Sequence, residues 1–473
     1  MAHKRLGFMQ LTIICGFSLY YAWYLITFFG LFMSSPIGTG FAEMHFGQVI
    51  FFGASVIATI GLLASFHKTG SIALGHTKFL FLASLIPGLL LPLVVAIGSV
   101  AGYPPLPIFY LACFASGASL AIGFMLWEDL ATHGYLNRGV LAHGTIFCAG
   151  GVLFLACELF LTLSQASVLA ILLLCASTAL LAFITPRCDT LEDKPVEPVK
   201  QYFRSTWHLD VIVSVINIAF GYAFILLYFK DLHILLVAMG IAIFVDLVFA
   251  LVIGRGKWVV FAGSARICTA FASCALILLV CPGGITKTIA LCTLVVFWFV
   301  FRTMNGGSLT DLANHHDFSM LYSSTRGKLP ANIGFTLGLA LGITAIGANI
   351  PDLARLYIPL LLVALFILTA LFFLPFDNES KTAGYHTLAL VDLHESQADT
   401  LNKTCESIAA RFKLSPRESE VLTYLVRGRN AKHIAEKLYL SESTVKTHIS
   451  NIYRKVGVHS QQELLDALDM ETA

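Results

Sequence analysis

Long stretches without a charged side chain most constrain what this chain can fold into. Residues 7–33, 79–99 and 166–186 contain no Asp, Glu, Lys or Arg. A helix needs about 20 such residues to cross a hydrocarbon layer about 30 Å thick. Only 12% of the 473 residues are charged, whereas soluble domains carry about 25% charged residues. The buried helices of a large soluble enzyme would be shorter and more amphipathic, so the sequence predicts a membrane protein.

The apolar runs predict twelve membrane-spanning helices within residues 1–376, six on each side of a polar loop at 187–206. The expected spans are residues 7–33, 46–66, 79–99, 106–127, 139–163, 166–186, 208–229, 232–253, 258–281, 285–304, 331–351 and 354–376. An even number of spans places both ends of this region on the same side of the bilayer.

The basic residues of the loops predict which side that is. The loops that share a side with the two ends hold most of the Lys and Arg, whereas the opposite loops hold only Lys230, Lys287 and Arg355. Loops rich in Lys and Arg stay in the cytoplasm. We therefore expect both termini to be cytoplasmic.

A short motif occurs at equivalent places in the two sets of six spans. Residues 129–133 read Asp-Leu-Ala-Thr-His after the fourth span, and residues 311–315 read Asp-Leu-Ala-Asn-His after the tenth. An Arg-Gly pair follows each of them, at 138–139 and at 326–327. The alternatives are a chance match and an internal repeat. A plan of two parallel six-helix halves resembles that of the major facilitator transporters.

Residues 413–473 differ from the rest because they are polar and rich in helix-capping signals, and a polar connector at 377–412 precedes them. Ser415 to Glu418 form a capping box with proline at the first helical position. Asn430 and Ser441 begin a second and a third helix, and Gly457 ends the third. A second capping box begins at Ser460. The tail is thus predicted to hold four helices, including a helix-turn-helix, so the expected fold is all-α throughout.

The tail resembles the LuxR-type (GerE-like) DNA-binding domain over about 56 residues. The matching residues are Leu414-Ser415-Pro416-Arg417-Glu418, Glu420-Val421-Leu422, Ile434-Ala435, Leu440-Ser441, Thr444-Val445-Lys446, His448, Asn451-Ile452, Lys455 and Gly457-Val458. The resemblance implies double-stranded DNA as a partner and base contacts at Lys446, Thr447 and Ser450. It also implies that the final helix, through Leu464, Leu465 and Leu468, forms a homodimer that reads two half-sites.

The charges of the third helix agree with DNA binding. Basic side chains outnumber acidic ones between residues 427 and 455, where Glu436 and Glu442 are the only carboxylates. Lys446, Thr447, Ser450 and Arg454 fall on one stripe of the helix. A lysine can donate to guanine, and a threonine methyl can contact thymine. Phosphate contacts are predicted for Ser443, Thr444, Arg454 and Lys455. The alternative is a solvated face of a protein–protein module.

Two charged residues lie inside neighbouring spans. Asp246 and Arg266 are each ten residues from Gly256, at the centre of a short hairpin, so they are predicted to pair at one depth. Such intramembrane charges are costly, and both a structural clamp and a ligand site remain open. The sequence shows no nucleophile–base arrangement, phosphate loop or metal-ligand set. We therefore expect no catalysis, no metal and no cofactor.

These features together predict a one-component transcriptional regulator in the bacterial cytoplasmic (inner) membrane. The membrane region (1–376) would bind an unknown small-molecule ligand in or through the lipid bilayer. The HTH domain (413–473) would bind promoter DNA in response. The alternative is a transporter with a fused regulatory DNA-binding domain.

Overall fold

The computed structural model divides the chain into two compact units, residues 1–386 and 387–473. In the first unit it describes residues 2–30, 41–69, 77–102, 105–132, 139–185, 207–230, 232–253, 271–279, 284–315, 320–347 and 361–365. In the second unit it describes residues 409, 411–426, 434–435, 441–458 and 464. These residues are almost entirely helical and include no strand, which confirms the all-α prediction for this part of the chain.

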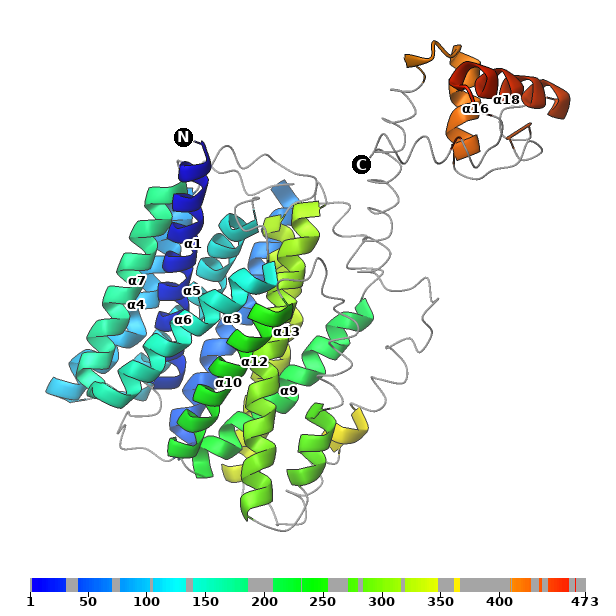
Figure 1. Cartoon of the computed structure of the whole chain (residues 1–473). Helices are drawn as coiled ribbons and strands as arrows, with labels where there is room; N and C mark the ends of the chain where they lie inside the picture. The colour runs from blue at the N-terminus through cyan, green and yellow to red at the C-terminus, as the bar shows by residue number, and fades with distance from the viewer. Residues whose placement is uncertain are drawn as a thin grey trace. The chain divides into compact units, whose positions relative to one another are not determined.

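The first unit is a bundle of long helices packed side by side (Figure 1). Its helices are α1 (Ala2–Leu25), continued by the π-helix η1 (Ile26–Gly30), α3 (Phe41–Thr69), α4 (Thr77–Ala101), α5 (Leu106–Thr132), α6 (Gly139–Phe160), α7 (Leu163–Ile184), α9 (Trp207–Lys230), α10 (Leu232–Ile253), α12 (Gly284–His315) and α13 (Met320–Gly347).

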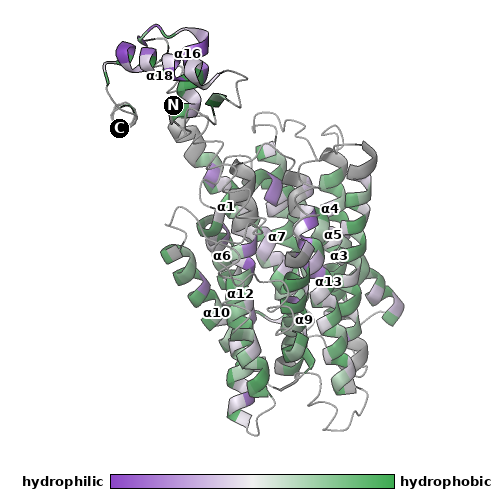
Figure 2. Ribbon diagram, turned by 90° about the vertical axis from the view of Figure 1, so that its right-hand side faces the viewer, coloured by the Kyte–Doolittle hydropathy of each residue, from purple (hydrophilic) through white to green (hydrophobic). Residues whose placement is uncertain are grey.

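Nine helices of the described part of the chain are long and apolar enough to cross a membrane, and Asp210–Leu226 is a shorter apolar helix. The predicted spans at 258–281 and 354–376 lie mostly outside the described residues, so the count of twelve stays a prediction. Large apolar side chains such as Ile57, Phe160 and Val252 are exposed on the surface of the bundle. Figure 2 shows that most residues of its helices are hydrophobic. An apolar surface of this kind is expected of a protein embedded in lipid.

Helix α13 begins at Met320, eleven residues before the start of the membrane span predicted at 331–351. Proline in a helix interior removes a backbone hydrogen bond and favours a helix end. The helix nevertheless continues through Pro330. The Pro330 carbonyl accepts a hydrogen bond from Ser214 Oγ of α9 at 3.1 Å. Burial of Tyr322 and Thr325 explains why the early part of the helix is ordered.

The second unit has its own apolar core. Helices α16 (Pro416–Val426) and α18 (Glu442–Val456) pack against each other. The fully or nearly fully buried members of the core are Val421, Leu422, Leu425, Ile434, Ala435, Val445, Ile452 and Leu464. The predicted second and fourth helices are described only at 434–435 and 464, so four helices remain a prediction.

Candidate functional site

Helix α18 has one face in the core and one face in solvent. Val445 and Ile452 are completely buried. Lys446, Thr447 and Ser450 are exposed, as is Arg454, so the predicted stripe is on the solvent face. This division is the amphipathic pattern of a helix that covers a core. The polar stripe is therefore accessible to a partner along the length of the helix.

The ends of α18 are fixed by local bonds. Ser441 Oγ accepts a hydrogen bond from the Thr444 backbone N–H at 3.1 Å, as predicted for an N-cap. Gly457 ends the helix with φ of 83°, a left-handed conformation that glycine adopts without strain. The exposed hydroxyls of Ser443 and Thr444 lie in the first turn. Both hydroxyls lie within hydrogen-bond distance of Ser441 Oγ, at 2.8 and 2.7 Å. The N-terminus of a helix attracts phosphate, and the phosphate contacts of these two residues stay a prediction.

Lys455 joins the two described helices. Its Nζ lies 2.6 Å from Glu418 Oε2 and 3.2 Å from the Lys413 carbonyl oxygen. Glu418 also forms the predicted capping box, since it accepts from the Ser415 backbone N–H at 2.7 Å. The Lys455 side chain is one-third exposed. Its contact with a DNA phosphate stays a prediction. In this structure its ammonium group is paired with the carboxylate of Glu418 in the same domain.

Glu418 is expected to make the second unit less stable in acid. The bond from Lys455 and the bond from the Ser415 N–H lower the pKa of the Glu418 carboxyl from 4.5 to about 2. Because the folded pKa is below the unfolded pKa, this stabilisation is complete above pH 4.5 and is lost as the pH falls towards 2. We expect Glu418→Gln to cost about 1–2 kcal/mol at neutral pH, from one cap and one partly exposed ion pair.

The measurement is the Tm of residues 387–473 between pH 7 and pH 2 for wild type and variant. The difference between them should shrink as the pH falls from 4.5 towards 2. Glu420→Gln is the control, because Glu420 is about half exposed and pairs with the exposed Arg417. A constant difference across this pH range would show that Glu418 does not carry the effect.

The predicted dimerisation residues are only partly described. Leu464 is completely buried in the core of its own domain, so its side chain is not available to a second copy. Leu465 and Leu468 lie outside the described residues. Dimerisation through the final helix therefore stays a prediction that rests on these two.

The predicted intramembrane pair is also only partly described, because Arg266 lies outside the described residues. Asp246 is completely buried in α10. Its Oδ2 accepts a hydrogen bond from Thr303 Oγ1 of α12 at 2.8 Å. The carboxylate thus ties α10 to α12, and its pairing with Arg266 remains untested.

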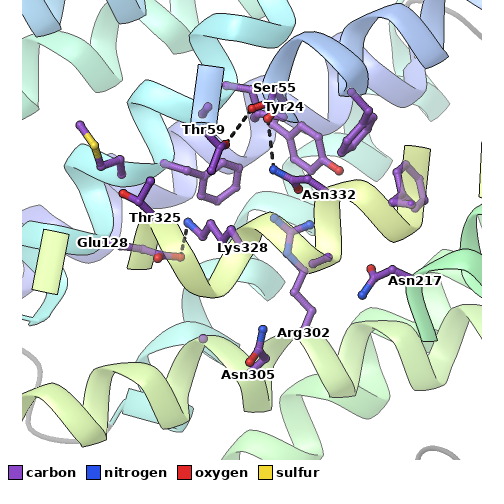
Figure 3. Close-up of a pocket in the computed structure, with 18 of the residues that line it drawn as sticks. Tyr24, Ser55, Thr59, Glu128, Asn217, Arg302, Asn305, Thr325, Lys328 and Asn332 are labelled. Atoms are coloured by element: carbon purple, nitrogen blue, oxygen red, sulfur yellow. Dashed lines mark hydrogen bonds and ion pairs between the residues drawn. The ribbon is translucent and has the colours of Figure 1, made fainter. Parts of the chain in front are cut away.

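A cavity of about 100 Å³ lies among helices from both halves of the first unit (Figure 3). Helices α1, α3, α5 and α6 supply one part of its wall, and α9, α12 and α13 supply the other. A water molecule needs only about 10–15 Å³ measured in this way. The cavity therefore has room for several waters or a small solute.

Three charged side chains that the sequence reasoning missed line this cavity: Glu128, Arg302 and Lys328. Lys328 Nζ of α13 lies 2.5 Å from Glu128 Oε1 of α5 and 4.3 Å from the centre of the Phe124 ring. Arg302 lies within the predicted span 285–304. A charged residue inside a predicted span indicates a functional site, because intramembrane charges usually face a bundle interior or a cavity.

Neutral polar groups complete the cavity wall. Asn332 Nδ2 of α13 donates to Ser55 Oγ of α3 at 3.2 Å, and Figure 3 shows both beside the Lys328–Glu128 pair. Asn217 Oδ1 accepts a hydrogen bond from Trp298 Nε1 at 2.9 Å. Among the described residues, no group of three His, Cys, Asp or Glu could hold a metal ion.

The tail matches known DNA-binding regulators. The family described as "Bacterial regulatory proteins, luxR family" matches residues 413–468. The Fimbriae Z protein of Escherichia coli K12 is 49% identical over 65 residues, which are 14% of this chain and 31% of that protein. The transcriptional regulatory protein LnrK of Bacillus subtilis is 52% identical over 50 residues, 11% of this chain and 23% of that protein. The chain thus spans about a third or less of these relatives.

The first unit matches a membrane transporter in fold. The human organic anion transporter MFSD10 (TETRAN) aligns with 78% of this chain and 98% of its own length, with a TM-score of 0.54 and 13% sequence identity. The second unit is too short to supply that share, so the match lies mainly in the membrane unit. Identity this low shows the fold alone. Residues 413–468 are therefore a LuxR-type helix-turn-helix domain, carried by a protein whose bundle of long apolar helices has the same fold as that transporter.

Proposed function

We propose that this protein is a membrane-embedded one-component transcriptional regulator. Its second unit binds promoter DNA, and its first unit senses a small molecule. The observation that carries the proposal is the exposed polar stripe of α18. This helix is capped at both ends, and its other face packs on the core. Such a stripe fits the major groove, which is wide enough to admit an α-helix.

In this proposal Lys446, Thr447 and Ser450 contact base edges. Ser443, Thr444 and Arg454 contact phosphates on either side, with Lys455 as a further candidate. Phosphate contacts fix the position of the helix, and base contacts provide the specificity. A homodimer, formed through Leu465 and Leu468 of the final helix, reads two half-sites.

The protein would lie in the cytoplasmic membrane of a bacterium with both termini in the cytoplasm. The excess of Lys and Arg in the loops on the side of the termini supports this orientation, and DNA binding requires it. The cavity between the two halves is the proposed place of the signal. A ligand there changes the DNA-bound fraction only to the extent that it binds one conformation of the protein better than another.

Replacement of Lys446 tests the DNA assignment. We expect Lys446→Ala to weaken binding to the preferred DNA site about 10–100-fold, because one base contact is worth about 1–3 kcal/mol. The preferred site is selected from random duplexes with residues 387–473, a unit with its own core. Binding is measured by fluorescence anisotropy at a fixed salt concentration.

Arg417→Ala is the matched control, because Arg417 is an exposed basic residue of α16 that pairs with Glu420. It should keep the affinity and the sequence preference. Unchanged specific binding by a folded Lys446→Ala domain would refute the base-contact role.

A second candidate is a transporter with a fused regulatory domain. The cavity lined by both halves favours it, because transport folds of two repeats bind substrates between them. A solute that raises the Tm of the purified protein is tested for uptake into membrane vesicles. Uptake that is lost in Asp246→Asn would support transport. Thermal protection without uptake would support sensing alone.

A further inference from the structure

The basic side chains around the cavity differ in how their charge is balanced. Lys328 is paired with Glu128. On the same helix α13, Arg326 Nη2 lies 2.5 Å from Asp210 Oδ2 of α9. Arg302 of α12 lines the cavity but makes no ion pair with any carboxylate of the described residues.

Arg302 is held by aromatic rings instead. Its guanidinium carbon lies 4.7–5.3 Å from the centres of five rings, contributed by α1, α5, α6 and α12. The rings belong to Tyr21, Tyr24, Phe124, Phe147 and Trp298. One of its N–H groups, on Nη1, donates to Tyr21 Oη at 3.2 Å.

This cage does not neutralise the charge. An aromatic ring attracts a cation through its quadrupole but carries no net negative charge, so the guanidinium keeps its full positive charge. Asp246 interacts electrostatically with Arg302, but its carboxylate bonds to Thr303 and does not line the cavity. With Lys328 and Glu128 balancing each other, the described wall of the cavity has an excess of one positive charge.

We propose that the cavity binds a small organic anion with a carboxylate group on Arg302 and an apolar body against the aromatic wall. This inference rests on the proposed sensing role of the membrane unit. It adds the chemical class of the ligand.

The shape and chemistry of the wall support a carboxylate. A guanidinium has five donors in a planar fork that matches a carboxylate with two parallel hydrogen bonds. Phe52 and Phe335 supply apolar surface, and the amides of Asn305 and Asn332 supply neutral hydrogen-bonding groups. A cationic ligand would instead face Arg302 and Lys328, and a like charge at short range is repelled in a medium of low dielectric constant.

Three probes of similar size but different charge test the proposal: benzoate, benzamide and benzylamine. Binding to the full-length protein in detergent is measured by the change in tryptophan fluorescence, because Trp298 lines the cavity, and by the shift in Tm. We expect benzoate to bind at least about tenfold more tightly than benzamide, the equivalent of about 1.4 kcal/mol. Benzylamine should not bind measurably.

Variants of Arg302 then test whether its positive charge causes the preference for benzoate. Arg302→Gln should remove the preference for benzoate over benzamide, and Arg302→Lys should keep a reduced preference because the charge remains without the fork. Lys287→Gln is the matched control, since Lys287 is exposed on the same helix α12 and does not line the cavity. Size-exclusion chromatography checks that each variant is folded.

Equal affinity for benzoate and benzamide would overturn the proposal, as would an unchanged preference in folded Arg302→Gln. Failure of benzoate to bind at millimolar concentration would overturn it as well. DNA binding by residues 387–473 is measured separately, so none of these results bears on the DNA-binding half of the proposed function.

Discussion

Val445→Asp is expected to unfold the C-terminal domain. Val445 is completely buried in the core of the second unit, a cluster that also includes Val421, Leu422 and Ile452. An unpaired carboxylate in an apolar core costs several kcal/mol. A domain of this size has a total stability of about 0.05–0.15 kcal/mol per residue, so a single such change can exceed it. The measurement is the helical circular dichroism signal of residues 387–473, which should fall to that of an unfolded chain.

The control for this variant lies on the opposite face of the same helix. Thr447 is exposed, so Thr447→Asp should leave the circular dichroism spectrum and the Tm almost unchanged. It should nevertheless abolish DNA binding, because a carboxylate would face the phosphates and base edges. A Val445→Asp domain that remains folded would contradict the burial of Val445. A Thr447→Asp domain that binds DNA like wild type would contradict the position of Thr447 on the DNA-binding face of α18.

Gly334→Ala is expected to destabilise the membrane unit by forcing α13 away from α9. A Cβ atom at this position of α13 would lie 2.2 Å from the backbone carbonyl oxygen of Ser214 on α9. The obstacle is backbone rather than a flexible side chain, so the two helices must move apart. They would also strain the hydrogen bond from Ser214 Oγ to the Pro330 carbonyl. Overpacking of this kind costs about 1–3 kcal/mol, occasionally more.

The effect is measured as the Tm of the full-length protein in detergent, followed by size-exclusion chromatography. Gly61→Ala is the matched control, because a Cβ at Gly61 of α3 meets no atom within 4 Å. This control should hold or raise the Tm, since alanine favours a helix over glycine by up to about 1 kcal/mol. Equal Tm values for the two variants would contradict the close packing of α9 on α13.

The features that the sequence predicted well are local ones. The capping box at Ser415 and Glu418, the N-cap at Ser441 and the end of α18 at Gly457 all depend on bonds within a few residues. Spacing alone therefore identifies them. The exposed stripe of α18 follows from the same helical spacing, because the apolar positions fix which face is buried.

The features that the sequence missed depend on distant residues. Arg302 and Tyr21 are 281 positions apart in the chain, and no local pattern indicates that they meet. The early start of α13 was missed for a related reason, since Tyr322 and Thr325 are buried in the bundle and no local pattern indicates that burial. Leu464 was expected to face a second copy, but its own domain already buries it, which a one-dimensional pattern of leucines cannot distinguish.

The most direct test of the central claim is DNA recovery with the intact protein from membranes. Cells expressing the full-length chain are crosslinked, the membrane fraction is isolated, and the DNA bound to the tagged protein is sequenced. We expect wild type to enrich discrete promoter regions, Lys446→Ala to enrich them far less, and Thr447→Asp not to enrich them. Recovery of the same DNA at the same level with all three proteins, or of no specific DNA with wild type, would contradict a membrane-bound regulator that reads DNA through α18.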